Sequence, residues 1–349
     1  MRAIQTTETG GPDVLRLAEL PDPEPGPGQL LVDVAAAGVN YIDTYHRSGA
    51  YPMPLPFIPG SEGAGTVSAV GTCAGDVSVG DRVAWATSLG SYAEQALVPA
   101  AQAVPVPGGV STDIAAGALL QGMTAHYLTV SVHPVQPGET VLVHAAAGGM
   151  GLLLTQLVTA RGARVIGTVS TPEKEQLARE VGAAEVIRYT EIDDLAGEVR
   201  RLTEGDGVAT VYDGVGASTF DASLASLHRR GMLALFGAAS GPVPPVDPQR
   251  LNAAGSVFLT RPKLADYVAT RDELTWRAGA VFDAILDKSL RITIGGRYPL
   301  AEASRAHQDL QARRTTGKLL LLPRRRPPAR SRESRCATAT GKPRSVAPR

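Results

Sequence analysis

The chain has 349 residues, of which 44% are hydrophobic and 19% charged, the composition of a globular protein long enough for two domains. It contains no apolar run of membrane-spanning length, no apolar core of a secretory signal near its N-terminus and only two cysteines, so we expect a cytoplasmic protein with no membrane partner and no disulfide framework. The formal net charge of zero hides an asymmetry, because nine Lys or Arg against the single acid Glu333 follow residue 323 and leave 25 basic and 33 acidic residues before it.

The first part of the chain is predicted to be mainly β. Short apolar runs at 2–6, 14–19 and 30–37 are separated by turns rich in glycine and proline, which no helix or central strand would cross. Residues 57–70 place three glycines in a β-rich run, and this pattern indicates a bulged strand in a small twisted barrel. Residues 40–47 have helix-start chemistry and an unusual density of polar side chains for a segment so close to an apparent core.

A glycine-rich turn then follows a short apolar strand at 141–143 and opens an apolar segment of helical length. The turn, Gly148-Gly149-Met150-Gly151, departs from the strict GxGxxG fingerprint because Ala146 stands where its first glycine would be. Backbone N–H groups at the start of a helix bind a pyrophosphate, and small residues let it approach. A tight packing turn is the alternative, but a second β-branched run follows, and this strand, turn, helix, strand order predicts a dinucleotide site.

The second strand of this unit decides which dinucleotide is expected. An NAD site usually offers a carboxylate at its end, but no acid stands there. Ser170 instead provides a hydroxyl, and Lys174 follows in a predicted helix start with Thr171 as N-cap and Pro172 in the first turn. A hydroxyl and an ammonium suit a 2′-phosphate, so we predict NADP(H), although Glu173 could turn toward a ribose and Lys174 could be a solvated lysine.

Strands continue to alternate with helical stretches in the middle of the chain. They are predicted at 141–143, 165–169, 185–189, 210–215, 232–236 and 257–259. Such alternation predicts a parallel, doubly wound sheet that binds its ligand at the carboxyl ends of the strands. Tyr189, the turn 213–216 and the turn 236–240 all fall at such ends.

The last part of the chain is predicted to return to the first domain. Residues 264–287 indicate one or two amphipathic helices, and strands at 292–299 and 318–322 flank a helix at 301–313. We expect an α/β protein with a discontinuous catalytic domain, a cofactor domain and a disordered basic tail. Their predicted limits are 1–121 with 262–323, 122–261, and 324–349.

Eight segments, in order along residues 1–323, resemble those of the zeta-crystallin-like quinone oxidoreductases of the medium-chain dehydrogenase/reductase superfamily. They are GVNYIDTYHRSG, GSEGAG, GDRVAW, HAAAGGMG, TPEK, VYDGVG, HRRGMLALFGAASG and FLTRP. The resemblance implies a GroES-like, mainly β catalytic domain around a Rossmann domain that binds NADPH. It also implies a homodimer joined through the edge strands of the two cofactor sheets.

The resemblance further implies which residues contact NADPH, and Gly148 and Gly151 of the glycine-rich turn join them. The expected set is Asn40, Tyr41, Ile42, Asp43, Thr44, Tyr45, Tyr127, Gly148, Gly149, Met150, Gly151, Ser170, Lys174, Tyr189, Val215, Phe236, Gly237, Ser240 and Arg313. Ser170 and Lys174 agree with the argument from the second strand.

No metal is expected. The zinc alcohol dehydrogenases of the superfamily carry a cysteine and a histidine as zinc ligands where this chain has Asn40 and Ser61, and their four-cysteine lobe is missing here. His126, His133 and His144 lie near the cofactor domain, but we expect surface or packing roles for them.

A quinone is an acceptor that needs no Lewis acid, because hydride addition makes an aromatic hydroquinone. We therefore expect an NADPH:quinone reductase in which Asn40 and Tyr45 are catalytic and donate hydrogen bonds to a carbonyl oxygen. Tyr45 could equally be an aromatic ring packed under the nicotinamide. We expect Asp43 to bind nearby backbone N–H groups and Arg47 to lie at the surface.

Two other functions compete with this prediction. An enoyl or alkenal reductase, which adds hydride to a carbon–carbon double bond, would have the same fold and cofactor. An RNA-binding protein would use the basic tail, which could bind phosphate non-specifically. A solvated extension explains the tail more simply, so we do not expect a nucleic-acid partner.

Overall fold

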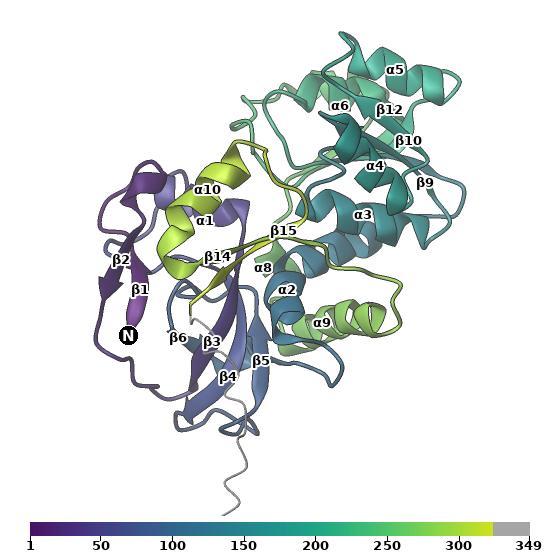
Figure 1. Cartoon of the computed structure of the whole chain (residues 1–349). Coiled ribbons are helices and arrows are strands. Elements are labelled where there is room, and N and C mark those ends of the chain that lie inside the picture. The colour runs from purple at the N-terminus through teal and green to yellow at the C-terminus, as the bar shows by residue number, and fades with distance from the viewer. Residues whose placement is uncertain (324–349) are drawn as a thin grey trace, which may run out of the picture.

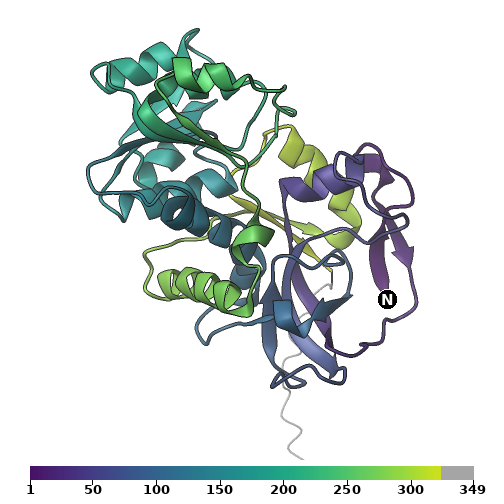
Figure 2. The same cartoon turned by 180° about the vertical axis from the view of Figure 1, so that it is seen from behind.

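The computed structural model describes residues 1–323, and they form two parts that each contain a large sheet (Figure 1). The view from behind shows the same division (Figure 2). The predicted α/β architecture is confirmed. The predicted disordered tail, residues 324–349, lies outside the described residues. In the described part of the chain, no helix combines the length and apolar character needed to cross a bilayer.

The cofactor part holds six parallel strands. Their spatial order is β10 (Glu185–Arg188), β9 (Arg164–Val169), β8 (Thr140–Val143), β11 (Val208–Asp213), β12 (Leu227–Leu235) and β13 (Phe258–Thr260). Numbered from β8, this is the 3-2-1-4-5-6 order of a doubly wound sheet. The crossovers contain α3 (Gly149–Thr159), α4 (Pro172–Glu180), α5 (Leu195–Leu202), α6 (Phe220–Ser226) and α7 (Pro248–Ala253).

Strand β12 begins five residues before the predicted start at Met232. Leu227 pairs with Val208 across a register shift, and the residues between include the exposed Arg229 and Arg230. Because this half of the strand faces solvent, it lacks the apolar run on which the prediction depended.

The catalytic part holds a seven-stranded, mostly antiparallel sheet and a small two-stranded sheet. The large sheet consists of β14 (Ile294–Pro299), β15 (Lys318–Leu322), β3 (Gln29–Val39), β4 (Glu62–Val70), β5 (Arg82–Trp85) and β7 (Val104–Pro105), with β6 (Gln95–Pro99) also paired to β3. The small sheet pairs β1 (Arg2–Gln5) with β2 (Arg16–Glu19). The predicted bulge is confirmed, because the register of β3 and β4 shifts at two points.

Five helices accompany the catalytic sheet, some of them far apart in sequence. They are α1 (Tyr41–Ser48), α2 (Thr112–Tyr127), α8 (Leu264–Tyr267), α9 (Arg271–Leu286) and α10 (Ala303–Gln311). Short helical turns lie at Pro12–Val14, Ala100–Gln102, Leu128–Val132 and Leu300–Glu302. Both views place α10 beside α1, although more than 250 residues separate them (Figures 1 and 2).

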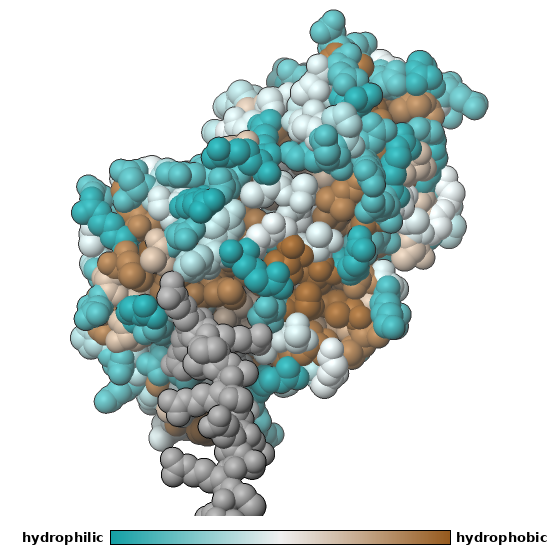
Figure 3. All heavy atoms as spheres, viewed as in Figure 1, coloured by the Kyte–Doolittle hydropathy of each residue, from teal (hydrophilic) through white to brown (hydrophobic). Residues whose placement is uncertain are grey.

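Helix α2 joins the two parts through a shared core. Leu119 and Met123 belong to one apolar cluster that runs from Ala64 in the catalytic sheet to Val141 and Leu154 in the cofactor part. On the face shown in Figure 3, apolar surface gathers around α2 and α9, whereas the outer end of the cofactor part is mostly hydrophilic. The shared core gives the two halves of the candidate site a fixed relative position.

Candidate active site

The glycine-rich turn joins β8 to α3, as predicted. Gly148 is the N-cap of α3, and Gly149 and Gly151 lie in its first turn. A Cβ on Gly149 would lie 2.5 Å from Oε1 of Gln121, and one on Gly151 would collide with the Ala145 carbonyl. The glycines therefore permit close packing of α2 and of the turn itself, and the N-terminus of α3 stays open toward an anion.

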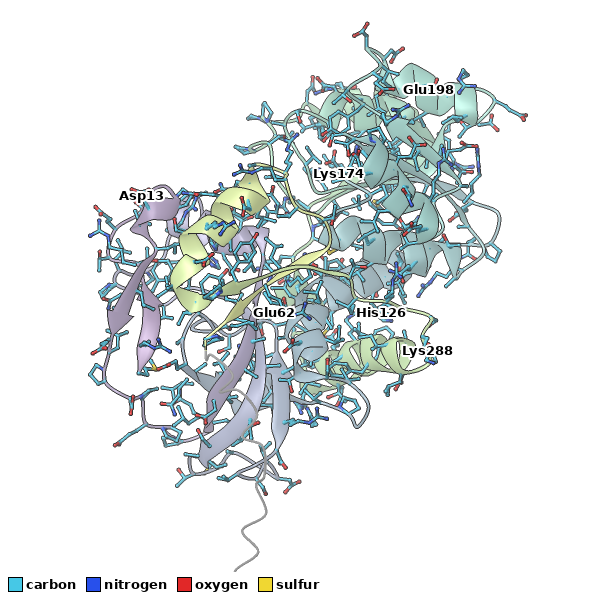
Figure 4. All side chains as sticks on the ribbon, in the orientation of Figure 1. Asp13, Glu62, His126, Lys174, Glu198 and Lys288 are labelled. Atoms are coloured by element: carbon cyan, nitrogen blue, oxygen red, sulfur yellow. The ribbon has the colours of Figure 1, made fainter. Side chains whose placement is uncertain are left out.

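Ser170, Lys174 and Arg313 meet at the end of β9. The Lys174 ammonium donates to the Arg313 carbonyl at 2.6 Å and lies 3.4 Å from Ser170 Oγ. Figure 4 labels Lys174 on the side of the cofactor part that faces the C-terminal segment. Thr171 caps α4 as predicted, by accepting the Lys174 backbone N–H. Within residues 1–323 no carboxylate forms an ion pair with Lys174 or Arg313. The Lys174 ammonium and the Ser170 hydroxyl are donors that fit a phosphate, and Arg313 meets them here through its carbonyl.

Helix α1 brings Tyr45 to the turn after β12. The Ala238 N–H donates to the Tyr45 hydroxyl at 3.1 Å, which leaves the Tyr45 proton able to donate elsewhere. Burial raises the pKa of Tyr45, so the hydroxyl stays protonated at neutral pH.

Two neighbours of Tyr45 were not named as site residues, although Arg261 lies in the FLTRP segment that carries the resemblance. The Tyr51 ring lies 5.2 Å from that of Tyr45, and Arg261 lies 3.4 Å from the Tyr51 hydroxyl. Tyr51 lies two residues after the segment GVNYIDTYHRSG, and the aromatic residues of that segment were a usable signal. Arg261 follows the last strand of the cofactor sheet, and only the folded chain brings it to α1.

Asn40 lies at the N-cap of α1 and is only 3% exposed. Its Oδ1 accepts from the Lys318 ammonium at 2.6 Å, and its Nδ2 donates to Glu62 at 3.0 Å and, more weakly, to the Gly38 carbonyl at 3.4 Å. Lys318 and Glu62 also form a fully buried ion pair with an N–O distance of 2.6 Å. The pair fixes the orientation of the Asn40 amide. Figure 4 labels Glu62 between the catalytic sheet and α2.

Asp43 has the structural role that was predicted for it. Its carboxylate accepts the backbone N–H groups of Asn40 and Ser61 and the hydroxyl of Tyr92. Burial is the main cause that raises the Asp43 pKa to about 6, and these hydrogen bonds oppose it.

The prediction for Arg47 was wrong. Its side chain is 2% exposed and lies against His307 and Gln311 of α10. It was expected at the surface because the sequence of α1 gives no sign that α10 covers that side of the helix.

The remaining predicted residues lie at different depths around these groups. Tyr189 is 37% exposed, directly follows β10 and is next to Thr190, which donates to the Ser170 carbonyl. The turn containing Val215 packs on the turn 236–240, where Ser240 binds the Val215 carbonyl. Tyr41, Ile42 and Met150 are half-buried, as are Phe236, Gly237 and Ser240.

Asp43, Thr44 and Tyr127 were predicted to contact NADPH, but all three side chains are buried. Thr44 is buried and donates to the Tyr41 carbonyl. Tyr127 is 1% exposed and stacks on Tyr267 with a ring-centroid distance of 4.1 Å.

No group of three or more His, Cys, Asp or Glu side chains in residues 1–323 is placed to hold a metal ion. His126 packs edge-on against Trp276. His144 is buried and both of its ring nitrogens have hydrogen-bond partners, so both histidines have the packing character that was expected. His133 pairs with Glu139. Ser61 donates its hydroxyl to Asp43.

Comparison with known proteins matches both halves of the chain. A family described as "Alcohol dehydrogenase GroES-like domain" matches residues 26–108, and one described as "Zinc-binding dehydrogenase" matches residues 149–275. The quinone oxidoreductase of Pseudomonas aeruginosa is 46% identical over 324 residues, which cover 92% of this chain and 99% of that protein.

Two further similarities bear on the chemistry. The 2-haloacrylate reductase of Burkholderia sp is 42% identical over 323 residues, which cover 90% of this chain and 96% of that protein. The solved structure of mycobacterial Rv1454c complexed with NADPH has a TM-score of 0.90 at 60% identity and covers 93% of this chain and 100% of that one.

Proposed function

The chain belongs to the quinone oxidoreductase family of the medium-chain dehydrogenases and reductases, and on this premise we propose that it passes hydride from NADPH to a quinone without a bound metal ion. When bound, NADPH supplies the hydride from its nicotinamide ring. The observation that carries the proposal is the meeting of Ser170, Lys174 and Arg313 at the ligand edge of the cofactor sheet, the same edge that Tyr45 contacts.

The residues around this edge suit the successive parts of NADPH. Ser170, Lys174 and the exposed Arg313 would hold the 2′-phosphate through charge-assisted hydrogen bonds. The backbone N–H groups at the start of α3 would hold the pyrophosphate. The turns 213–216 and 236–240 and the N-terminal half of α1 would then surround the nicotinamide.

Tyr45 is proposed as the hydrogen-bond donor to the acceptor oxygen. A quinone takes up one hydride and one proton to become a hydroquinone, and negative charge develops on its oxygen as the hydride arrives. The Tyr45 hydroxyl already accepts from Ala238, so its proton is oriented away from that bond. Asn40 is not proposed as a second donor, because its amide already donates to Glu62 and to the Gly38 carbonyl; its part is to hold the start of α1 beside the site. Tyr51 and Arg261 would lie at the outer side of Tyr45.

Zinc is not proposed here, although one matching family is described as zinc-binding. Asn40 and Ser61 hold the positions at which the resemblance places zinc ligands. Asn40 is engaged with Lys318 and Glu62, and Ser61 with Asp43. An amide and a hydroxyl are poor ligands for zinc, and the Lys318 ammonium would repel it.

The test is the rate of NADPH and NADH oxidation by the purified chain with 1,4-benzoquinone, before and after dialysis against a chelator. We expect turnover with NADPH to exceed that with NADH and to survive chelation. Loss of turnover that zinc restores would disprove the metal-free mechanism. Equal rates with NADPH and NADH would disprove the proposal that Ser170, Lys174 and Arg313 bind the 2′-phosphate.

Reduction of a conjugated carbon–carbon double bond is the second candidate, because a 2-haloacrylate reductase is among the relatives at 42% identity. The same bound cofactor and the same Tyr45 donor would serve an α,β-unsaturated acid or aldehyde. A panel of benzoquinone, 2-alkenal, 2-haloacrylate and crotonyl thioester separates the two candidates. If kcat/KM for any of the alkenes exceeds that for benzoquinone, the alkene and not the quinone is the acceptor.

We further propose a cytoplasmic homodimer that has no nucleic-acid partner. The edge strand β13 supports the dimer, since Phe258 on it is 57% exposed. For the domain limits we propose 1–121 with 262–323 and 122–261, so that the first limit falls within α2, the helix that joins the two parts. Their support is that all six strands of the cofactor sheet lie between residues 140 and 260.

A further inference from the structure

A buried chain of hydrogen bonds links two ligand-facing turns of the cofactor part, and no step of the proposed reaction uses it. Its members are Thr168, His144, Ser223 and Asp213, each at most 3% exposed. They come from β9, the end of β8, α6 and the end of β11. Three of these elements lead directly into the turns that face the ligand.

The distances make the chain continuous. Thr168 Oγ1 lies 3.1 Å from His144 Nδ1, His144 Nε2 lies 2.9 Å from Ser223 Oγ, and the Ser223 hydroxyl donates to Asp213 at 2.7 Å. At one end the Ala145 N–H donates to Thr168 Oγ1 at 3.3 Å. At the other end Asp213 accepts the backbone N–H groups that follow it, those of Val215 and Gly216.

The direction of these hydrogen bonds fixes which ring nitrogen of His144 carries the proton. The Asp213 carboxylate can only accept, so Ser223 donates to it and must accept from His144 Nε2. Burial lowers the pKa of His144, and a neutral ring with its proton on Nε2 accepts at Nδ1 from the Thr168 hydroxyl. Every donor then points toward Asp213, and bonds aligned in this way strengthen one another.

Both ends of this series of hydrogen bonds hold backbone that the cofactor site needs. One end holds the turn from Ala145 to Gly151, which we call the phosphate turn. Ala145 has a positive φ of 50°, an unfavourable conformation for a residue other than glycine, and its carbonyl accepts the Gly148 N–H of the phosphate turn. The turn after Asp213 accepts the Ala239 and Ser240 N–H groups of the turn 236–240. Ala238 of that turn binds Tyr45.

We propose that His144 is a positioning residue for NADPH, which holds the phosphate turn and the turn after Asp213 in one fixed arrangement. It does not touch the ligand. The inference rests on the proposed cofactor site. A misplaced turn after Asp213 would weaken binding of the nicotinamide half and leave the 2′-phosphate half in place.

The first experiment compares Thr168→Val with Thr210→Val. Both residues are buried strand threonines of the same sheet, but Thr210 Oγ1 has no hydrogen-bond partner within residues 1–323. We expect Thr168→Val to weaken NADPH binding roughly tenfold, because it leaves His144 Nδ1 and the Ala145 N–H unpaired, and Thr168→Ser to restore it. Thr210→Val should stay within about twofold of the wild type. Equal effects of the two valine variants would overturn the proposal.

The second experiment interrupts the series of buried hydrogen bonds at Ser223. We expect Ser223→Ala to weaken NADPH roughly tenfold while the dissociation constant of 2′,5′-ADP, which lacks the nicotinamide half, stays unchanged. Parallel loss of both ligands, or of neither, would contradict the proposal. If the wild type itself binds no NADPH, the proposed function fails. If the wild type binds it and the variants bind equally well, only the role of His144 fails.

A spectroscopic measurement on the wild type covers the case in which a variant does not fold. Two-bond ¹H–¹⁵N correlation of the imidazole rings reports the position of the proton. More than one buried histidine is neutral between pH 5 and 8, so the signal of His144 is identified by its loss in His144→Gln. We expect that signal to report a neutral ring with its proton on Nε2 throughout this range. A proton on Nδ1 would overturn the proposed direction of the chain.

Discussion

Tyr45 is the residue at which the two parts of the protein meet chemically. Its hydroxyl accepts from a backbone N–H of the cofactor part, and its ring lies beside Tyr51 in the catalytic part. A ring that only packed under the nicotinamide would not need its oxygen. Removing the hydroxyl therefore tests which of the two roles that the sequence leaves open applies to this residue.

Replacing Tyr45 by Phe keeps the ring and removes the donor. If the hydroxyl stabilises the developing charge on the acceptor, kcat with 1,4-benzoquinone should fall about 100-fold, the usual effect of losing one such donor. The dissociation constant of NADPH should change little. Steady-state kinetics and a fluorescence titration of NADPH measure the two effects. An unchanged kcat would leave Tyr45 a packing residue.

Lys174 should set the preference of the enzyme for NADPH over NADH. Lys174→Ala removes the ammonium from the proposed 2′-phosphate site, so we expect KM for NADPH to rise about tenfold or more while KM for NADH stays nearly constant. Glu173→Gln is the matched control, since Glu173 is exposed and belongs to the same helical turn. A gain of NADPH selectivity in the control would mean that Glu173 opposes the phosphate.

At the scale of elements, β15 and α10 hold α1 in place. Lys318 of β15 binds Asn40 at the start of α1, and His307 and Gln311 of α10 contact Arg47 near its end. The backbone N–H of Gly317, next to Lys318, donates to the Ala147 carbonyl of the phosphate turn. The last two elements of the described chain thus connect the acceptor side with the cofactor side.

Lys318→Met should destabilise the protein strongly, by about 3–5 kcal/mol, because it leaves the Glu62 carboxylate buried without its cation. The double variant Lys318→Met with Glu62→Met should recover most of that loss. Arg305→Ala, which breaks an exposed pair with Glu302, should cost at most about 1 kcal/mol. Urea unfolding measures all three. A single variant as stable as the wild type would show that the ion pair contributes nothing to stability.

His307 should make stability depend on pH. Burial lowers its pKa to about 3 from the ordinary value of 6.5, so its neutral form stabilises the fold fully above pH 6.5. As pH falls from 6.5 toward 3, the His307 imidazole is protonated in the unfolded state but not in the folded state. The free energy of unfolding therefore drops by up to about 1.4 kcal/mol per pH unit. His307→Gln should flatten this slope. The other histidines are common to both proteins, so an equally steep slope would assign the effect to them.

At the scale of the whole molecule, the edge of the cofactor sheet is the natural place for self-association. Strand β13 pairs only with β12 in the described residues, and an unpaired strand edge with an exposed Phe258 favours pairing with a second copy. Such pairing would place the two sheets side by side and leave both ligand edges open.

Phe258→Asp should convert the proposed dimer into a monomer, because two carboxylates would face each other across the two-fold axis. Light scattering after size-exclusion chromatography measures the mass. Val79→Asp is the control, since Val79 is 64% exposed but lies in a turn of the catalytic part. A dimer that survives Phe258→Asp and dissociates with Val79→Asp would place the interface elsewhere.

The sequence by itself determined the local features of this protein. Apolar periodicity and turn residues predicted the six strands of the cofactor sheet and most strands of the catalytic part, but not the short β6 and β7. The order of strand, glycine turn and helix predicted the dinucleotide site. These features depend on neighbours within a few residues, where propensity and capping act. Where a strand faced solvent, as at Arg229 and Arg230 in β12, the apolar signal was missing and the prediction began too late.

Only the tertiary structure decided which distant side chains share a site. It joined Asn40 to Lys318, Tyr51 to Arg261, and His144 to Ser223, pairs separated by 79 to 278 residues. It also buried Arg47, which looked like a surface residue of an isolated helix. A polar residue shows its local backbone preference in the sequence, but its partner depends on how the sheets and helices pack. Buried polar groups must find such partners, because leaving them unpaired costs more than the bond itself contributes.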